Sequence, residues 1–327
     1  MFQNSNKKLF LTLTALIAVI SLALTGCSDD NSADMSSPEE KPLIVVTTNI
    51  LGDVVTSMVG DNFDVEIIMP PGSDPHDFQA SAKQVAKMMA ADLLIANGAN
   101  FEEGMLDVLK AAESDGVMIF EAISFVNQLE AHDDHGEEAH DDHESHDHGG
   151  VDPHFFTDPA RMAQVVEGLS QFLVANFPEV NESSLVSNAT SYMEELESLD
   201  AEVEEMLSAI PVGSRILVTN HSVFEYFADR YQFEILGSII PSSSTLSSAS
   251  AKQIANLAEE LKLNQITAIF ADASSSDALA QALAGEADSV KVINLYSESL
   301  GDPNSSGATY IDMVRFNAEA ISSALFK

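Results

Sequence analysis

Short apolar runs alternate with helical patterns along most of this chain, and the alternation occurs twice. In the first half, buried-strand patterns at 43–48, 64–69, 92–96 and 117–120 alternate with helical patterns at 50–59, 81–89 and 101–112. In the second half, strand patterns at 215–219, 234–237, 268–271 and 290–295 alternate with helical patterns at 222–230, 250–261, 276–284 and 308–325. Strands that alternate with helices predict right-handed βαβ units on parallel sheets.

A long helical pattern separates the two halves. Residues 158–176 form an amphipathic segment that Pro178 ends, and residues 181–209 then keep Leu and Met at helical spacing with few helix breakers. A helix of that length is unusual inside one domain. We therefore predict an α/β protein with two lobes, each a mostly parallel sheet flanked by helices, joined by a rigid spine helix. The predicted limits are 42–180, 181–210 and 211–327, with ligand groups in the cleft between the lobes.

The N-terminus has the pattern of an export signal. Lys7 and Lys8 precede an apolar run over 9–24 that ends in Leu-Thr-Gly before Cys27. Small residues before a cysteine at that place resemble a bacterial lipobox. We predict a signal peptide over 1–26, lipidation of Cys27, and a disordered polar tether over 27–41. An ordinary cleaved signal with an incidental cysteine is the alternative.

The composition is strongly acidic, with 52 Asp and Glu against 14 Lys and Arg. Nucleic-acid binding needs a basic surface, so this composition excludes it as a general property. The charge is consistent with solubility outside the cell or with a field that concentrates cations; because it is spread widely, we favour solubility for most of the surface. We expect a monomer.

The nine histidines fall into two groups. Six lie in an acidic segment over 132–148, named here the histidine tract: His132, His135, His140, His143, His146 and His148. We expect this tract to lie in a disordered loop over 130–150 that binds metal weakly, or to be only a solvated linker.

The other three histidines are isolated. His76 and His154 share an Asp-Pro-His sequence, and all three, including His221, follow or end predicted strands. Proline makes such a turn rigid, and the neighbouring carboxylate is placed to orient the imidazole. Imidazole binds Zn, Cu, Ni and Fe, so the pattern predicts a transition-metal site with a fourth ligand from Asp272 or Glu298.

No enzyme motif competes with this interpretation. The sequence lacks His-Glu-x-x-His, Gly-x-Ser-x-Gly, a Walker A loop and Gly-x-Gly-x-x-Gly. A metallohydrolase is the weakest alternative, and we predict a protein that is not an enzyme.

Six stretches of the sequence resemble the metal-binding substrate-binding proteins of ABC transporters, the cluster A-I type that includes ZnuA-like and TroA-like proteins. These stretches lie at 71–76, 91–98, 152–159, 219–231, 296–301 and 309–313. The segment 218–247 looks most like the AztC-type zinc proteins. The resemblance covers about residues 42–327. It implies a metal between two lobes, with His76, His154 and His221 as ligands. It places Glu298 where the family usually has Asp.

The resemblance also implies a function. The chain would capture Zn²⁺ outside the cytoplasmic membrane, held by an N-terminal lipid or free in the periplasm, and deliver it to a permease and its ATPase. Two alternatives stay open: a manganese-importer binding protein of the same architecture, and a lipid-anchored zinc buffer or surface-interaction protein without a permease.

Overall fold

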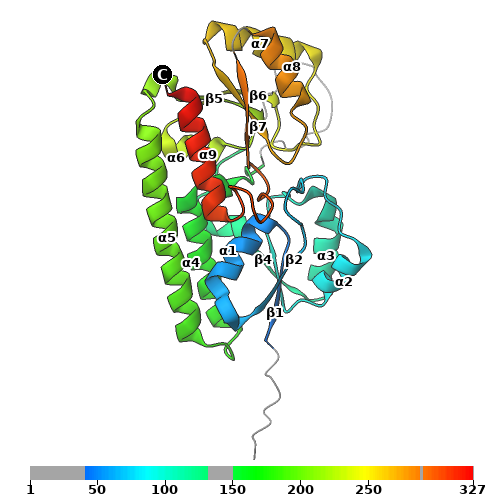
Figure 1. Ribbon diagram of the computed structural model, residues 1–327. Coiled ribbons are helices and arrows are strands. Elements are labelled where there is room, and N and C mark those ends of the chain that lie inside the picture. Colours follow the sequence, from blue (N-terminus) through cyan, green and yellow to red (C-terminus); the bar gives the residue numbers. More distant parts are fainter. Residues whose placement is uncertain (1–40, 132–149, 288–289, 327) are drawn as a thin grey trace, which may run out of the picture. The chain divides into compact units, whose positions relative to one another are not determined.

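The computed structural model describes residues 41–131, 150–287 and 290–326. The predicted signal peptide, Cys27, nearly all of the tether and the histidine tract lie outside the described residues. The described chain from Lys41 onward forms one compact unit. It contains two four-stranded sheets, each entirely parallel (Figure 1).

The two sheets have the same strand order. The first sheet has the order β2-β1-β3-β4 and the second the order β6-β5-β7-β8. The strands of the first are β1 (Leu43–Val46), β2 (Asp64–Ile67), β3 (Leu93–Ala96) and β4 (Met118–Glu121). Those of the second are β5 (Ile216–His221), β6 (Glu234–Ile240), β7 (Ala268–Asp272) and β8 (Lys291–Leu295). The predicted fold class, with two α/β lobes, is confirmed.

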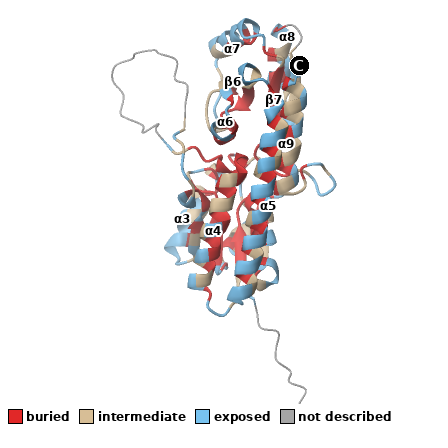
Figure 2. Cartoon of the chain, turned by 90° about the vertical axis from the view of Figure 1, so that its left-hand side faces the viewer, coloured by how far each residue is buried: buried red, intermediate tan, exposed pale blue. Residues whose placement is uncertain are grey.

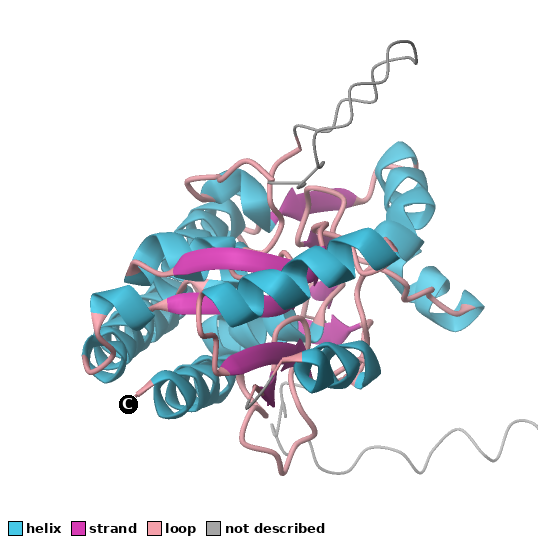
Figure 3. Ribbon diagram, turned by 90° about the horizontal axis from the view of Figure 1, so that it is seen from above, coloured by secondary structure: helices cyan, strands magenta, loops and turns pink. Residues whose placement is uncertain are grey.

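Helices flank the strands, as the view from above shows (Figure 3). In the first half these are α1 (Asn49–Val59), α2 (Ala82–Met89), α3 (Leu106–Ser114) and α4 (Pro159–Asn176). In the second half they are α6 (Glu225–Tyr231), α7 (Ala251–Leu263), α8 (Ala278–Glu286) and α9 (Tyr310–Leu325). None of the helices in the described ranges is long and apolar enough to cross a bilayer.

Each sheet is buried on both faces, which explains why its central strands read as continuous apolar runs. Along β1, Ile44 and Val46 face a large core that contains residues of both sheets, whereas Val45 faces a smaller core of the first sheet alone. In β5, Leu217 faces the shared core and Val218 faces a core of the second sheet. The shared core joins the two halves, and the lobe limits 42–180 and 211–327 stay predictions.

The predicted spine is α5 (Glu182–Ser208), which packs against α1, α4 and α9. Its 27 residues extend about 40 Å at the usual rise per residue, enough to run alongside both sheets (Figure 1). One face is buried at helical spacing and the other is exposed (Figure 2). The buried residues are Leu185, Ala189, Tyr192, Leu196, Leu199, Val203 and Leu207.

Two predicted helix starts are wrong by several residues. The segment predicted as helix over 101–112 begins with a 3₁₀ turn, Glu103–Met105, because the Glu102 carboxylate turns back to accept hydrogen bonds from the backbone of Asn97 and Gly98. The helix predicted from residue 222 begins at Glu225, because the Ser222 N–H donates to the Ser242 carbonyl and keeps that segment extended beside its neighbour.

Candidate metal centre

Four buried side chains from separate segments meet between the two sheets. His76 lies in the loop after β2, His154 in the turn before α4, His221 at the last position of β5, and Glu298 in the loop after β8. None of the four is more than 2% exposed. Parallel strands end at the same edge of a sheet, so the loops after β2, β5 and β8 reach a common crevice. We call these residues the four-residue cluster.

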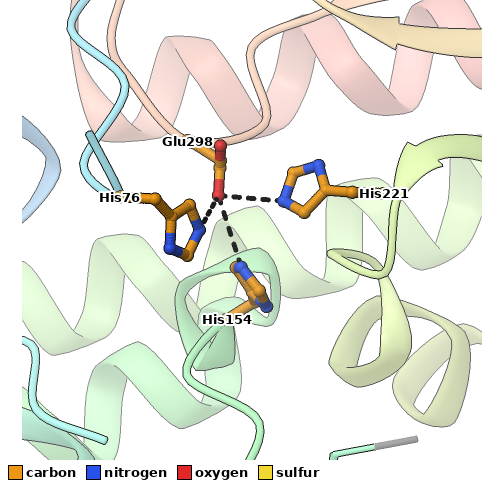
Figure 4. A group of neighbouring side chains, drawn as sticks. All are labelled: His76, His154, His221 and Glu298. Carbon is orange, nitrogen blue, oxygen red and sulfur yellow. Dashed lines mark hydrogen bonds and ion pairs between the residues drawn. The ribbon is translucent and has the colours of Figure 1, made fainter. Parts of the chain in front are cut away.

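The three imidazoles point at one carboxylate oxygen (Figure 4). Glu298 Oε1 lies 2.8 Å from His76 Nε2, 2.9 Å from His221 Nε2 and 3.3 Å from His154 Nε2. The four potential ligand atoms all lie within 4.8 Å of one another. A tetrahedral Zn²⁺ site with bonds of about 2.0 Å has ligand–ligand distances of roughly 3.3 Å, so the cluster can hold such an ion once its most widely separated ligand atoms move closer together.

Two of the three imidazoles are oriented by carboxylates. His154 Nδ1 donates to Asp152 Oδ1 at 2.7 Å, and His76 Nδ1 donates to Glu103 Oε1 at 3.0 Å. In the neutral ring, the form that binds a metal, each of these bonds would place the proton on Nδ1 and present the Nε2 lone pair to an ion in the cluster. His221 Nδ1 has no hydrogen-bond partner among the described residues.

The two Asp-Pro-His turns therefore differ. In both, the Asp accepts a hydrogen bond from the backbone N–H of the His, at 2.9 Å in the first turn and 3.0 Å in the second. Only Asp152 also orients its imidazole. Asp74 instead accepts a hydrogen bond from the Thr245 hydroxyl at 2.7 Å, and Glu103 accepts the hydrogen bond from the His76 ring. The expectation that each turn orients its own histidine is correct for one turn and wrong for the other.

Aromatic rings form one wall of the cluster. Phe101 lies edge-on to His76 and His154, with ring centroids 5.1 Å and 5.5 Å apart, and Phe156 lies 5.9 Å from His154. Such a wall excludes water and lowers the local dielectric, which strengthens every charge interaction inside it.

The electrostatics of the cluster favour a bound cation. Burial raises the pKa of Glu298, but the charge of His221 and the close approach of the three imidazole nitrogens outweigh it and hold that pKa well below the usual value. Burial also lowers the pKa of His76, yet its hydrogen bonds to Glu103 and Glu298 raise it to about 10. The pKa of His154 is raised too, because Asp152 and Glu298 outweigh the effect of burial. Glu298 is therefore ionised at neutral pH, and its negative charge is available to a bound cation.

Several buried polar atoms in or beside the cluster lack a hydrogen-bond partner within the described residues. They include His154 Nε2, Glu298 Oε2 and Asp152 Oδ2. Leaving a buried polar atom unpaired costs roughly 1–3 kcal/mol, so proteins keep such atoms where a ligand completes them. These atoms fit a cation-binding role for the cluster.

The structure brings together three of the predicted ligands with one of the two alternatives for the fourth. Asp272 is buried, but its carboxylate accepts hydrogen bonds from Ser274 and Ser297 and is not part of the cluster. The sequence predicted that His154 follows a strand, and this is wrong for the described residues. An isolated bridge between Glu130 and Val151 lies just before it there, and no strand of the sheet does. Sequence reasoning missed Glu103, because nothing local connects it to a histidine 27 positions away.

The family profile described as "Zinc-uptake complex component A periplasmic" matches residues 44–324. The chain belongs to this ZnuA family. It is a family of substrate-binding transport proteins and not of enzymes. The description places the family in the periplasm, which agrees with the predicted location outside the cytoplasmic membrane.

Relatives of known function are named for two metals. The manganese-binding lipoprotein MntA of Bacillus subtilis is 30% identical over 96% of this chain and 98% of its own length. The zinc-binding lipoprotein AdcA of Streptococcus pneumoniae is 31% identical over 96% of this chain, which spans 60% of that longer protein. The metal ABC transporter substrate-binding lipoprotein SsaB of Streptococcus sanguinis is 27% identical, and all of its length is covered.

Solved structures share the fold. The periplasmic zinc-binding protein TroA from Treponema pallidum superimposes with a TM-score of 0.76 at 27% identity, covering 88% of this chain and all of TroA. A Mn-bound periplasmic metal-binding protein from Candidatus Liberibacter asiaticus gives a TM-score of 0.74 at 22% identity. The chain is thus a metal-binding substrate-binding protein of the ABC-transporter type, and the comparisons leave the metal undecided between zinc and manganese.

Proposed function

We propose that this protein captures Zn²⁺ outside the cytoplasmic membrane and delivers it to an ABC-type importer. His76, His154, His221 and Glu298 are the proposed ligands. The observation that carries the proposal is the convergence of three imidazole Nε2 atoms on Glu298 Oε1, at 2.8, 3.3 and 2.9 Å.

The donor set supports zinc as the cargo. Three imidazoles with one carboxylate suit zinc, whereas manganese prefers more oxygen ligands and lies lower in the affinity series of divalent metals. Four protein ligands also make a closed shell without an open position for water, which fits an ion that is carried and not one that performs catalysis.

Delivery requires partners that receive the ion. SsaB is named as a metal ABC transporter substrate-binding lipoprotein, so a permease and its ATPase are the proposed partners here. Lipidation of Cys27, which lies outside the described residues, is the proposed means of keeping the protein beside them.

Manganese is the second candidate cargo. It is supported by MntA, which is similar to this chain over nearly the full length of both proteins and is named for manganese. Its binding would need the same cluster with added water or a bidentate Glu298, because Mn²⁺ favours more than four, mostly oxygen, ligands.

Native mass spectrometry followed by competition with a zinc chelator tests the proposal. The wild-type protein should hold one tightly bound Zn²⁺ and should exchange it for Mn²⁺ only at a large excess. A variant with His76, His154 and His221 all changed to Ala should lose that ion, while Glu113→Gln on the exposed surface of α3 should keep it. Retention of the tight ion by the triple variant would refute the ligand assignment, and stronger binding of Mn²⁺ by the wild type would favour the second candidate.

A further inference from the structure

Asn49 connects the Glu298 loop to the other half of the molecule. It is the first residue of α1 and is buried. Its side-chain Oδ1 accepts a hydrogen bond from the Leu300 N–H at 2.7 Å, and its Nδ2 donates to the Ser299 hydroxyl at 2.8 Å and to the Pro70 carbonyl at 3.0 Å. One carboxamide thus holds the chain directly after Glu298 and the turn that leads to His76.

The same two segments also bond to each other directly. The Gly72 N–H lies 2.8 Å from the Ser299 hydroxyl oxygen and 3.2 Å from the Leu300 carbonyl, and it donates to both. Gly72 has a positive φ of 76°, which a residue with a side chain rarely adopts, so the turn brings its N–H to this point at low cost. His76 follows four residues later in the same loop.

A second asparagine holds the other side of Glu298. Asn317 of α9 accepts from the Tyr296 N–H at 3.0 Å and donates to the Tyr296 carbonyl at 2.7 Å. The loop that carries Glu298 is therefore held on both sides of that residue. Asn317 of α9 bonds to Tyr296 before it, and Asn49 of α1 bonds to Ser299 and Leu300 after it. The Asn49 carboxamide donates and accepts at once; an ionised Asp at position 49 would meet the Pro70 carbonyl without a proton to share.

We propose that Asn49 is a positioning residue of the metal site, which fixes the Glu298 loop of the second half against the His76 loop of the first. The inference rests on the proposed function, since it concerns the same four ligands. It makes the fourth ligand depend on a residue that touches no metal. It also means that Glu298 is held by α1 of the first half as well as by α9 of the second, whereas His221 lies in β5 and pairs with Ile240 of β6 in the second half.

A double-mutant cycle with Zn²⁺ as the probe tests whether Asn49 acts through Glu298. Asn49→Leu preserves volume and removes the three hydrogen bonds. In the wild-type background it should weaken Zn²⁺ binding by roughly 10- to 100-fold, the usual effect of removing a group that orients a ligand. In a Glu298→Gln background the same change should weaken binding less than about threefold, because the ligand it positions is already impaired. Equal losses in both backgrounds, or wild-type affinity of Asn49→Leu, would overturn the proposal.

Two additions keep the test decisive. If Asn49→Leu does not fold, Ser299→Ala replaces it in the cycle, since Ser299→Ala removes the hydroxyl that accepts hydrogen bonds from Asn49 and Gly72.

Asn62→Ala is the matched control. The Asn62 side chain also joins a 3₁₀ turn to α5 but lies away from the cluster, so this variant should bind Zn²⁺ like the wild type. The absorption spectrum of the Co²⁺-loaded protein gives an independent signature, and it should change in Asn49→Leu and not in Asn62→Ala.

Hydrogen exchange of the metal-free protein separates this inference from the proposed function. Peptides that cover 296–303 should exchange faster in Asn49→Leu, while those covering β8 should not change. This readout needs no bound metal. If the wild type bound no zinc, the proposed function would fail, yet faster exchange confined to 296–303 would still support the contact role of Asn49 and unchanged exchange would remove it.

Discussion

Asp152 Oδ1 accepts two hydrogen bonds from His154, one from the backbone N–H at 3.0 Å and one from Nδ1 at 2.7 Å. The pair fixes both the turn and the tautomer of the ring, so that Nε2 faces the other imidazoles. The arrangement is local, since Pro153 alone separates the partners in sequence, and it supplies a carboxylate that is itself fully buried.

Asp152→Ala should weaken Zn²⁺ binding by about 10- to 100-fold, because His154 then loses the group that sets its tautomer and orientation. Asp152→Asn should lose less, since its amide oxygen still accepts from Nδ1. Chelator competition measures both, with Asp115→Asn on the exposed surface as the control. Unchanged affinity in Asp152→Ala would show that packing alone orients His154.

The metal-free protein should lose stability as the pH rises above the ordinary histidine range. The pKa of His76 is raised from 6.5 to about 10, so its stabilising contribution is complete below pH 6.5 and disappears as the pH rises through about 10. The pKa of Glu298 is lowered from 4.5, so its contribution is present above that value and disappears as the pH falls through the lowered one. Both contributions are complete between pH 4.5 and pH 6.5, so the melting temperature of the metal-free protein should be highest in that range.

Calorimetry from pH 5 to pH 10 measures this trend, and His76→Gln should flatten its alkaline side. A metal-free wild type whose melting temperature followed that of His76→Gln across the range would contradict the role given to His76.

The affinity for zinc should rise with pH, opposite to the stability of the metal-free protein, because the ion displaces protons from the ligands. Titration calorimetry in buffers of different ionisation enthalpy should detect proton release near neutral pH.

The choice between zinc and manganese should depend on His221. Replacing it with Glu changes a three-imidazole set to two imidazoles and two carboxylates, which is a harder donor set. His221→Glu should lower the ratio of Zn²⁺ to Mn²⁺ affinity by about tenfold or more, measured by direct competition. His221→Gln, which adds no charge, is the comparison. An unchanged ratio in His221→Glu would mean that the other ligands set the preference.

The histidine tract should supply weak additional binding without supplying the tight ligands. The described residues on either side of it meet, since the Ala131 N–H donates to the Gly150 carbonyl at 2.8 Å, so a short glycine linker can replace residues 132–148. The deletion should remove weakly bound metal seen by mass spectrometry and slow the uptake of chelated zinc, with the tight dissociation constant nearly unchanged. Loss of the tight ion would show that the tract provides ligands to the centre.

Membrane attachment should depend on Cys27, because a lipid is the only anchor that the sequence predicts once the signal is removed. Cys27→Ala should release the protein from the membrane fraction or block its processing. Cell fractionation with immunoblotting measures this, and Ser28→Ala serves as the neighbouring control. A processed Cys27→Ala protein that stays on the membrane would refute the anchor.

Much of this protein is determined by local sequence. The apolar runs at 43–46 and 216–218 predict strands buried on both faces, because a parallel sheet covered by helices on both sides favours apolar residues at successive positions. The spacing of Leu196, Leu199 and Val203 predicts α5, because one face of a long helix must repeat every 3.6 residues to pack. Asp-Pro-His turns and an isolated histidine at a strand end predict a metal centre, because rigid, oriented imidazoles have few other uses.

Only the tertiary structure decided which distant groups complete that centre. Glu298 and Asp272 are both carboxylates after strands of the second sheet, and sequence position does not separate them; the packing of the 296–300 loop against α1 brings Glu298 to His76 and leaves Asp272 bonded to Ser297. Glu103 and Asn49 gain their roles in the same way. Their partners lie 27 and about 250 positions away, and contacts over such distances depend on how the two sheets pack, which no local pattern encodes.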